Sequence, residues 1–366
     1  MNSWLFDSLI LLGYFAGIIG IGLAAARRQS SFTDYALGGR KMPWWAVLAS
    51  ILAAEISAAT FLGAPGEGYA LRNFTYAQLA IGTILARVLV SWIFIKPYYA
   101  YNVVSIYEFL EKRFGPQSRQ AASAVFLITR ALASGTRLYV AAIVLVLGWE
   151  MISGAKASPE AELAIYIVAL LVLVLLTAVY TVAGGIKAVV WTDVIQAVVM
   201  FSGLGFVLWH LFQSIPGGLP AIHEKLNQPS DLTFWNFGPM VSGDLGATIK
   251  GILESDYTIW TAFLAATFVT MATHGTDQDM VQRMLTAKNP ARSRLALVGS
   301  GLADIPIVLA FLGIGILLYL HYQQAPDPNL PTRNAHIFAY YILHELPPGF
   351  RGLLIAGIFA TAMGSL

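Results

Sequence analysis

The sequence predicts an all-α membrane protein, and three observations carry this prediction. Hydrophobic residues make up 57% of the 366 residues and charged residues only 11%, whereas soluble domains contain about 25% charged residues. Apolar stretches long enough to cross a bilayer as a helix, which takes about 20 residues, recur along the whole chain. The linkers between them alternate in net charge. We therefore predict a single transmembrane domain over residues 1–366.

The apolar stretches follow one another without an intervening soluble domain or low-complexity tract. The first contains the acidic Asp7 instead of a basic leader, which argues against a cleaved signal peptide. In chain order, the nine stretches cover about 5–26, 44–66, 75–97, 120–148, 163–182, 189–212, 257–277, 295–320 and 350–366. Each is a candidate membrane helix, so we expect a multi-pass protein embedded in a lipid bilayer.

The charges of the linkers predict the orientation. Four linkers carry an excess of Lys and Arg, namely 27–42, 96–119, 183–188 and 279–294. The alternate linkers are neutral or acidic, namely 67–74, 149–162 and 213–256. Because an excess of Lys and Arg marks cytoplasmic loops, we predict a protein of the cell membrane with its N-terminus outside.

Several classes of function find no support in the sequence. The absence of cysteine excludes disulfides, thiolate metal sites and a cysteine nucleophile. The six histidines are dispersed, and no paired acids or nucleophile–base set suggests an enzyme. A channel would need a repeated filter or a ring of charges, and neither is present. We therefore predict no enzyme activity and no nucleic-acid partner.

Two of the apolar stretches are interrupted by polar and helix-breaking residues. Stretch 44–66 contains Glu55 and ends in a Gly/Pro run, and stretch 257–277 contains Thr273, His274 and Gly275 near its inner end. Such residues cost free energy in a membrane unless they line a cavity or face the bundle interior. Two interrupted spans in corresponding halves point to a transporter's midplane site. We predict unwound backbone near Glu55–Ser57 and near His274–Gly275.

The segment 180–196 joins two of the apolar stretches. It contains Gly184-Gly185, Lys187, Asp193 and Gln196, and predicts a tight turn followed by an acid and an amide buried in the next helix. The whole string resembles the signature of the sodium:solute symporter family, whose members couple sodium entry to uptake of sugars, amino acids or small carboxylates. Further resemblances lie in residues 34–45, 106–115 and 276–289, so the resemblance covers the entire chain.

The resemblance implies an inverted-repeat LeuT-type bundle with an extra N-terminal helix. When the first helix is set aside, the two interrupted stretches are helices one and six of the remainder, which matches five helices followed by five of opposite topology. Core repeat one then covers about 44–212 and a partial core repeat two about 257–366. Because the family continues beyond the point where this sequence stops, we expect the second repeat to be incomplete and the chain to be C-terminally truncated.

The function implied by the resemblance is sodium-coupled secondary active symport of a small polar organic solute, such as a sugar, polyol, amino acid or carboxylate, by alternating access. Two alternatives remain open. Symporter-like domains also occur fused to histidine kinases, where they serve as membrane input domains of sensor proteins. The chain could also be a fragment of a transporter without activity of its own.

A sodium site follows from the same resemblance. Sodium is a hard cation that prefers oxygen ligands, which unwound helices supply as backbone carbonyls and hydroxyls. The family's main site corresponds to the carbonyls of Ala53 and Ile56 and the hydroxyls of Thr361 and Ser365. The last two residues are i and i+4 and share a helical face. The alternative is that these hydroxyls only bond backbone carbonyls or aid packing.

A second sodium site is implied at Asp193, together with Ser365. Asp193 resembles an acid that is associated with such a site in some family members. The alternative interpretation is a buried acid that is hydrogen-bonded to neighbouring hydroxyls.

The solute site is expected at the first interrupted stretch. Glu55 is an ionisable group inside a span and is a functional-site candidate for that reason, and Thr60 matches a solute-facing position of the family. Thr273 and His274 take the places of an aromatic pair in sugar transporters, and Arg137 lies in the region where relatives that take carboxylates use an arginine. The alternatives are a structural Glu55–Arg137 ion pair and a satisfied interior histidine at His274.

Overall fold

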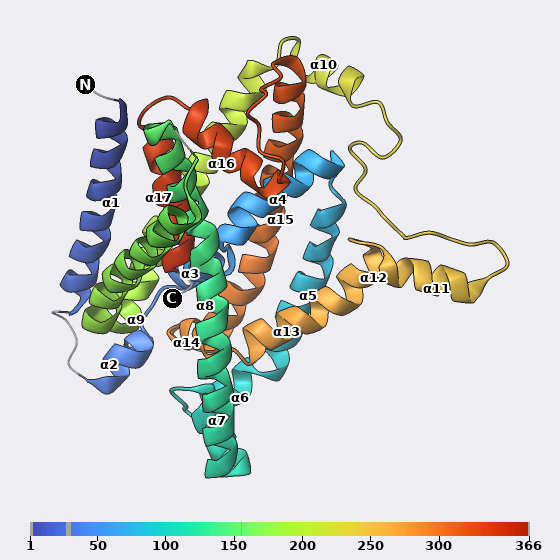
Figure 1. Cartoon of the computed structure of the whole chain (residues 1–366). Coiled ribbons are helices and arrows are strands. Elements are labelled where there is room, and N and C mark those ends of the chain that lie inside the picture. The colour runs from blue at the N-terminus through green and yellow to red at the C-terminus, as the bar shows by residue number, and fades with distance from the viewer. Residues whose placement is uncertain (1–2, 27–30, 155, 365–366) are drawn as a thin grey trace.

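The computed structural model describes residues 3–26, 31–154 and 156–364, which form a bundle of helices (Figure 1). No strand occurs in these ranges, and one isolated bridge pairs Met42 with Ala287. The helices in the first part of the chain are α1 (Ser3–Ala26), α2 (Phe32–Leu37), α3 (Trp44–Glu55), α4 (Ala58–Leu71), α5 (Leu79–Ile93), α6 (Ile95–Ala100), α7 (Ile106–Phe114), α8 (Pro116–Ser153) and α9 (Pro159–Ser214). Those in the second part are α10 (Gly218–Lys225), α11 (Leu245–Glu254), α12 (Ile259–Thr261), α13 (Thr267–Gly275), α14 (Gln278–Leu285), α15 (Pro290–Gln324), α16 (Asn334–His344) and α17 (Phe350–Met363).

Within the described ranges, five helices are long and apolar enough to cross a membrane, or six if α3 and α4 together form one bent span. The remaining predicted stretches have other forms. Stretch 257–277 divides into α12, a π-helical turn at Ala262–Ala266 and α13. Stretch 350–366 contains α17, which has 14 residues. The two stretches at 163–182 and 189–212 both lie in α9.

The helix α9 is two helices that meet at Gly185. Its 56 residues would extend about 84 Å at 1.5 Å per residue, far more than the hydrocarbon layer of about 30 Å. Gly185 has φ 55° and ψ −160°, a backbone conformation that a residue with a side chain rarely adopts. The neighbouring Gly184 allows close contact with α1, since a Cβ there would lie 2.6 Å from the carbonyl oxygen of Gly22. The predicted tight turn is therefore present.

Segments that carry the family resemblance meet at one end of the bundle. The Lys187 ammonium, after the Gly185 turn, lies 3.4 Å from an Asp34 carboxylate oxygen on α2. The side-chain carbonyl of Gln278 on α14 accepts a hydrogen bond of 2.9 Å from the backbone N–H of Ile106 on α7. Figure 1 shows α2, α6 and α7 in the lower part of the molecule, and α10 and α16 in the upper part. The described part of the first basic linker, 31–42, and the basic linker 96–119 are thus on one side.

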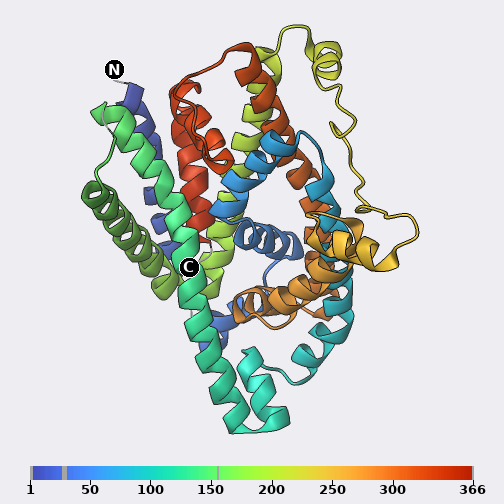
Figure 2. The ribbon, with the colours of Figure 1, turned by 45° about the vertical axis from the view of Figure 1, so that its right-hand side comes forward.

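A buried ion pair fixes the N-terminal helix to the bundle. Asp7 on α1 is 4% exposed, and its carboxylate accepts a hydrogen bond of 2.7 Å from Nε of Arg351 on α17. The backbone N–H groups of Gly349 and Gly352 donate to the other carboxylate oxygen. Because each partner is buried and would be costly to leave without the other, this pair holds α1 against α17. The two helices lie beside each other in Figure 2.

Candidate functional site

The clearest irregularity inside the membrane region is the break between α3 and α4. Ile56 and Ser57 separate the two helices, whose axes differ by 69°. The Ser57 hydroxyl caps the start of α4 by accepting a hydrogen bond of 3.3 Å from the backbone N–H of Thr60. A break at membrane depth leaves backbone groups without helical partners. The unwinding predicted at Glu55–Ser57 is present, with Glu55 as the last residue of α3.

The second break does not lie where the sequence predicted it. His274 and Gly275 are helical, and the chain leaves the helix at Thr276 and Asp277. The side chain of Asp277 caps α14 by accepting a hydrogen bond of 2.9 Å from the backbone N–H of Asp279. An N-cap favours the start of a new helix at that point, whereas a glycine near a helix end does not by itself break the helix. The prediction at His274–Gly275 was therefore wrong by two residues.

A π-helical turn at Ala262–Ala266 provides a further irregularity in the same segment. It faces Gly82 on α5, where a Cβ would lie 1.9 Å from the carbonyl oxygen of Ala262 and 2.8 Å from the backbone nitrogen of Thr267. Only glycine allows this approach of two backbones. π-helical turns are frequent at functional sites, and Ala265 and Ala266 line the cavity described below.

Glu55 forms an ion pair with Arg87 of α5. The Arg87 side chain is fully buried, and its Nη1 also donates to the hydroxyl of Thr83 at 3.4 Å. It passes Gly301 of α15, where a Cβ would lie 2.9 Å from Cδ and Nη1 of the arginine. Nε2 of His274 lies 3.8 Å from the Glu55 carboxylate. The sequence analysis missed Arg87, although an arginine inside the apolar stretch 75–97 is a signal of the same kind as Glu55.

Arg137 is not the partner of Glu55, so the alternative of a structural pair between these two residues was wrong. The charged neighbours of Arg137 on α8 are Arg130, Asp279, Asp277 and Arg283. Arg130 itself forms an ion pair of 2.9 Å with Asp279. Spacing along a sequence does not indicate which helix packs against α3, and the helix that brings a guanidinium to Glu55 is α5.

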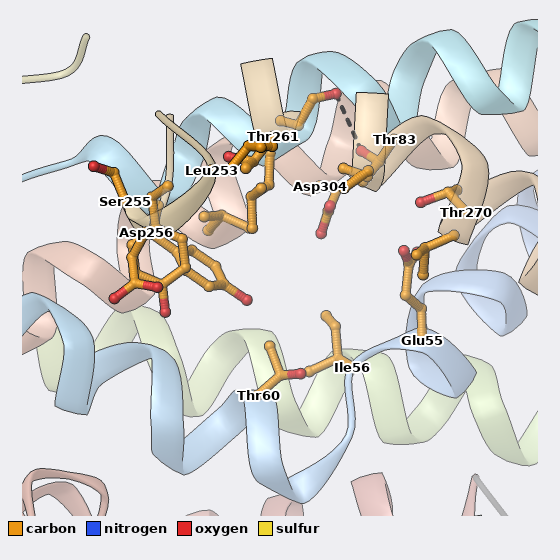
Figure 3. A pocket seen from close by; sticks show the side chains of 18 residues that line it. Glu55, Ile56, Thr60, Thr83, Leu253, Ser255, Asp256, Thr261, Thr270 and Asp304 are labelled. Atoms are coloured by element: carbon orange, nitrogen blue, oxygen red, sulfur yellow. Dashed lines mark hydrogen bonds between the residues drawn. The ribbon is translucent and has the colours of Figure 1, made fainter. Parts of the chain in front are cut away.

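A cavity of ≈ 540 Å³ adjoins the break, and Glu55, Ile56 and Thr60 line it (Figure 3). Thr270 and Asp304 also line it, and Figure 3 shows these two with Glu55 toward one end of the cavity, and Ser255 and Asp256 toward the other. Thr273 and His274 are not among the lining residues. His274 instead lies behind Glu55, 2% exposed, with its Nδ1 3.0 Å from the Thr273 hydroxyl.

Asp304 is the main lining residue that the sequence analysis did not identify. It lies on α15, one turn after Gly301. An acid within the apolar stretch 295–320 could have been noticed by the same reasoning that singled out Glu55.

The end of α3 lies close to the end of α17, where the sodium site was predicted. A Cβ on Gly364 would lie 3.3 Å from the carbonyl oxygen of Ala53. Thr361 is 2% exposed, and its hydroxyl donates a hydrogen bond of 2.7 Å to the carbonyl of Ile358. The structure thus brings Ala53 to the last turn of α17. Ser365 lies outside the described residues.

Asp193 is buried, 1% exposed, and bound to Arg283 of α14. The guanidinium Nε lies 3.2 Å from Asp193 Oδ2, and the Ser50 hydroxyl donates to the same oxygen at 2.5 Å. Nη2 of Arg283 donates to the carbonyl of Gly364 at 3.2 Å. The guanidinium therefore places a positive charge beside Asp193. Sequence reasoning missed this partner, although Arg283 lies in the segment 276–289, which carries part of the family resemblance.

The described residues contain no group of three His, Asp or Glu side chains that could hold a metal ion. A sodium ion has no such requirement, since carbonyl and hydroxyl oxygens suffice. The cavity and the end of α17 offer such oxygens from threonine hydroxyls and backbone carbonyls.

Comparison with known proteins agrees with the resemblance found in residues 180–196. The model of the sodium:solute symporter family matches residues 35–366. The sodium/sialic acid symporter NanT of Aliivibrio fischeri is 26% identical over 365 residues, which are 98% of this chain and 66% of that protein. The human sodium/iodide cotransporter is 28% identical over 380 residues, covering 100% of this chain and 54% of that protein. The chain therefore spans about half to two thirds of the length of these relatives.

A solved structure supports the fold. It is the substrate-bound outward-open state of a Na⁺-coupled sialic acid symporter, 26% identical in sequence, with a TM-score of 0.81 over 98% of this chain and 70% of the other. The match confirms the predicted fold class, an all-helical LeuT-type bundle. All of the matches named here are transport proteins.

Proposed function

Because this chain belongs to the sodium:solute symporter family, we propose that the protein at its full natural length couples sodium entry to uptake of a small polar organic solute. The observation that carries the proposal is the break between α3 and α4, with a cavity of ≈ 540 Å³ beside it. A broken span exposes backbone oxygens to an ion and side chains to a solute at the same depth. Alternating access to this cavity would couple the two.

The solute site of the proposal is the cavity wall at the break. Glu55 and Thr60 line the cavity, and Arg87 forms an ion pair with the Glu55 carboxylate. His274 lies beside Glu55 and contacts the Thr273 hydroxyl, and neither residue lines the cavity. Arg137 is left out of the proposed site, because its charged neighbours are elsewhere.

The sodium site of the proposal joins the end of α3 to α17. The carbonyl oxygens of Ala53 and Ile56 would coordinate the ion together with the hydroxyl oxygen of Thr361. That hydroxyl donates its hydrogen to the Ile358 carbonyl, and a hydroxyl oxygen can accept or coordinate while its hydrogen is donated. Ser365 completes the family pattern but lies outside the described residues.

The proposed sodium coupling does not depend on the second sodium site. Arg283 already places a guanidinium on Asp193, and a sodium ion bound there would meet the repulsion of that charge. We assign Asp193 first of all to its pairing with Arg283. The proposed coupling rests on the site at Ala53, Ile56 and Thr361.

A cell-membrane location with the N-terminus outside is part of the same proposal. It is supported by the basic residues that follow α2 and those around α6 and α7, which lie on one side of the molecule (Figure 1). Lys and Arg accumulate in cytoplasmic loops, so this side would face the cytoplasm.

The experiment is uptake into proteoliposomes that contain the protein at its full natural length. A panel of labelled sugars, amino acids, amines and carboxylates is offered with an inward sodium gradient, and then with potassium in place of sodium. We expect at least one solute to accumulate above its external concentration only with the sodium gradient. Binding of a solute without accumulation would instead indicate a sensor input domain, and would contradict the proposal.

A further inference from the structure

The cavity beside the α3–α4 break is lined by carboxylates without an accompanying cation. Three acids line it, namely Glu55, Asp256 and Asp304, and the described lining residues include no Lys, Arg or His. A smaller cavity of ≈ 340 Å³ shares Asp256 and Tyr257 with it and adds Glu67, again without a basic residue among the described lining. The cavity and its neighbour thus present one sign of charge, which concentrates cations and repels anions.

The charge of Glu55 is compensated within the protein. Arg87, fully buried, forms an ion pair with it, and Nε2 of His274 lies 3.8 Å away, buried and without a hydrogen-bond partner in the described part of the chain. Neither group is a lining residue of the cavity. Glu55 therefore adds a hydrogen-bond acceptor to the cavity but little net charge.

Asp304 is not compensated in the same way. We find no hydrogen bond or ion pair of its carboxylate with any described residue, although it lines the cavity near Glu55 (Figure 3). Arg87 attracts the Asp304 carboxylate electrostatically, but its Nη2 and Nη1 hydrogen-bond to Glu55 and Thr83. Glu55 and Asp304 thus share one guanidinium, and a carboxylate in a partly buried cavity is costly unless a positive partner reaches it.

Two aromatic rings stand in the wall of the same cavity. Tyr76 and Tyr257 both line it, and their rings meet edge to face with centroids 5.0 Å apart. Aromatic faces attract ammonium groups. An acid and a pair of tyrosines in one cavity are groups that can bind a protonated amine.

From these observations we infer that the solute carries a protonated amine, which binds the Asp304 carboxylate between Glu55 and the Tyr76–Tyr257 pair. The hydroxyls of Thr60, Thr83 and Thr270, which line the cavity, serve the polar remainder of the solute. This inference rests on the proposed function, since it names the solute class of the proposed site. A solute whose only charge is negative would be repelled by Asp304, which shares the guanidinium of Arg87 with Glu55.

The test measures binding of matched compounds to the purified protein at its full natural length, with sodium present. Each set has one scaffold that carries an ammonium, a hydroxyl or a carboxylate group, for example glucosamine, glucose and glucuronate, or ethanolamine, ethylene glycol and glycolate. The readout is the dissociation constant, obtained by thermal shift and calorimetry. We expect the ammonium member of at least one set to bind at least tenfold more tightly than its two counterparts, because a charged partner strengthens a hydrogen bond.

The variant Asp304→Asn removes the charge and keeps the shape. It is expected to lower the preference for ammonium about tenfold while the melting temperature without solute stays unchanged or rises. Asp304→Glu keeps the charge and is expected to keep a preference for ammonium, and it replaces the first variant if Asp304→Asn does not fold. Glu224→Gln, on the exposed face of α10, removes one acid far from the cavity and should leave all affinities unchanged.

Three results would overturn the inference: tighter binding of a hydroxyl or carboxylate member, no binding by any ammonium compound, or an undiminished ammonium preference in Asp304→Asn. The sodium dependence separates this failure from failure of the proposed function. If a neutral or anionic solute binds more tightly with sodium than with potassium, the amine inference fails and the proposed function stands. If solute binding never responds to sodium, the proposed function fails.

Discussion

Glu55 joins the two features that define the candidate site, the α3–α4 break and the cavity wall, and it forms an ion pair with Arg87. Its position inside an apolar stretch marked it as a site candidate, and it lies at the break and in the cavity wall. The alternative of a structural ion pair joined it to Arg137 on the wrong helix, because Arg87 and Arg137 are equally conspicuous in the sequence. Only the packing of α5 against α15, which brings Arg87 past Gly301, decides between them. A sequence reveals buried charges more easily than it reveals their partners.

The Glu55–Arg87 pair makes a prediction about stability. In Glu55→Gln, Arg87 stays buried without its carboxylate, so the free energy of unfolding should fall by about 3 kcal/mol. The double variant Glu55→Gln/Arg87→Gln should recover part of this loss. The measurement is the melting temperature of the purified protein. Glu254→Gln is the control, since its partner Lys250 is exposed and 3.8 Å away, and such pairs contribute little. Equal melting temperatures for Glu55→Gln and Glu254→Gln would contradict the buried pair.

At the scale of elements, the first break was predicted and the second was misplaced. The residues around Glu55 carry both an ionisable group and a following Gly/Pro run, so the two signals coincide. In the second segment the polar residues at Thr273–His274 remain helical, and the chain breaks where Asp277 caps α14. The π-helical turn at Ala262–Ala266 had no signal within its own apolar sequence, and the glycine that it approaches closely, Gly82, lies on another helix.

The contact at Gly82 gives a prediction at this scale. In Gly82→Ala the new methyl group would collide with backbone atoms of Ala262 and Thr267, so α5 must separate from the π-helical turn. We expect a loss of about 1–3 kcal/mol in the free energy of unfolding and weaker solute binding, because Ala265 and Ala266 line the cavity. Gly63→Ala in α4 is the matched control, as nothing lies within 4 Å of its Cβ position. A Gly82→Ala variant as stable as Gly63→Ala would show that the two backbones do not touch.

At the scale of the whole molecule, the fold class was predictable because bilayer thickness and backbone hydrogen bonding leave helices as almost the only choice for apolar stretches of this length. The family followed from one contiguous string, 180–196, and the Gly185 turn within it is present. The number of long spans was harder to predict. The two stretches at 163–182 and 189–212 correspond to the two helices that meet at Gly185 in α9. Stretch 257–277 instead divides, because local backbone geometry is not visible in hydropathy.

The orientation of the whole molecule is testable because the chain has no cysteine. A single cysteine at His223 on α10 or at Gln117 near the start of α8 would be the only thiol of the chain, and both positions are exposed. We expect a membrane-impermeant maleimide added to intact cells to label His223→Cys but not Gln117→Cys, and to label both after permeabilisation. The opposite pattern would reverse the proposed orientation of the N-terminus.

The most direct test of the account concerns the sodium site at the end of α17. Thr361→Ala removes one hydroxyl that the proposal assigns to the ion. Thr136→Ala is the matched control, because Thr136 on α8 makes the same i−3 hydrogen bond, 2.8 Å against 2.7 Å for Thr361, but is exposed and far along the chain from α3. Such a hydroxyl contributes only about 1 kcal/mol to packing, so both variants should fold.

The measurement is the sodium concentration that gives half-maximal solute uptake by the protein at its full natural length. If Thr361 coordinates sodium, this concentration should rise about fivefold or more in Thr361→Ala, which corresponds to about 1 kcal/mol or more of lost binding free energy. It should stay at the wild-type value in Thr136→Ala. An unchanged half-maximal sodium concentration in a well-folded Thr361→Ala protein would contradict the assignment of sodium coupling to this site.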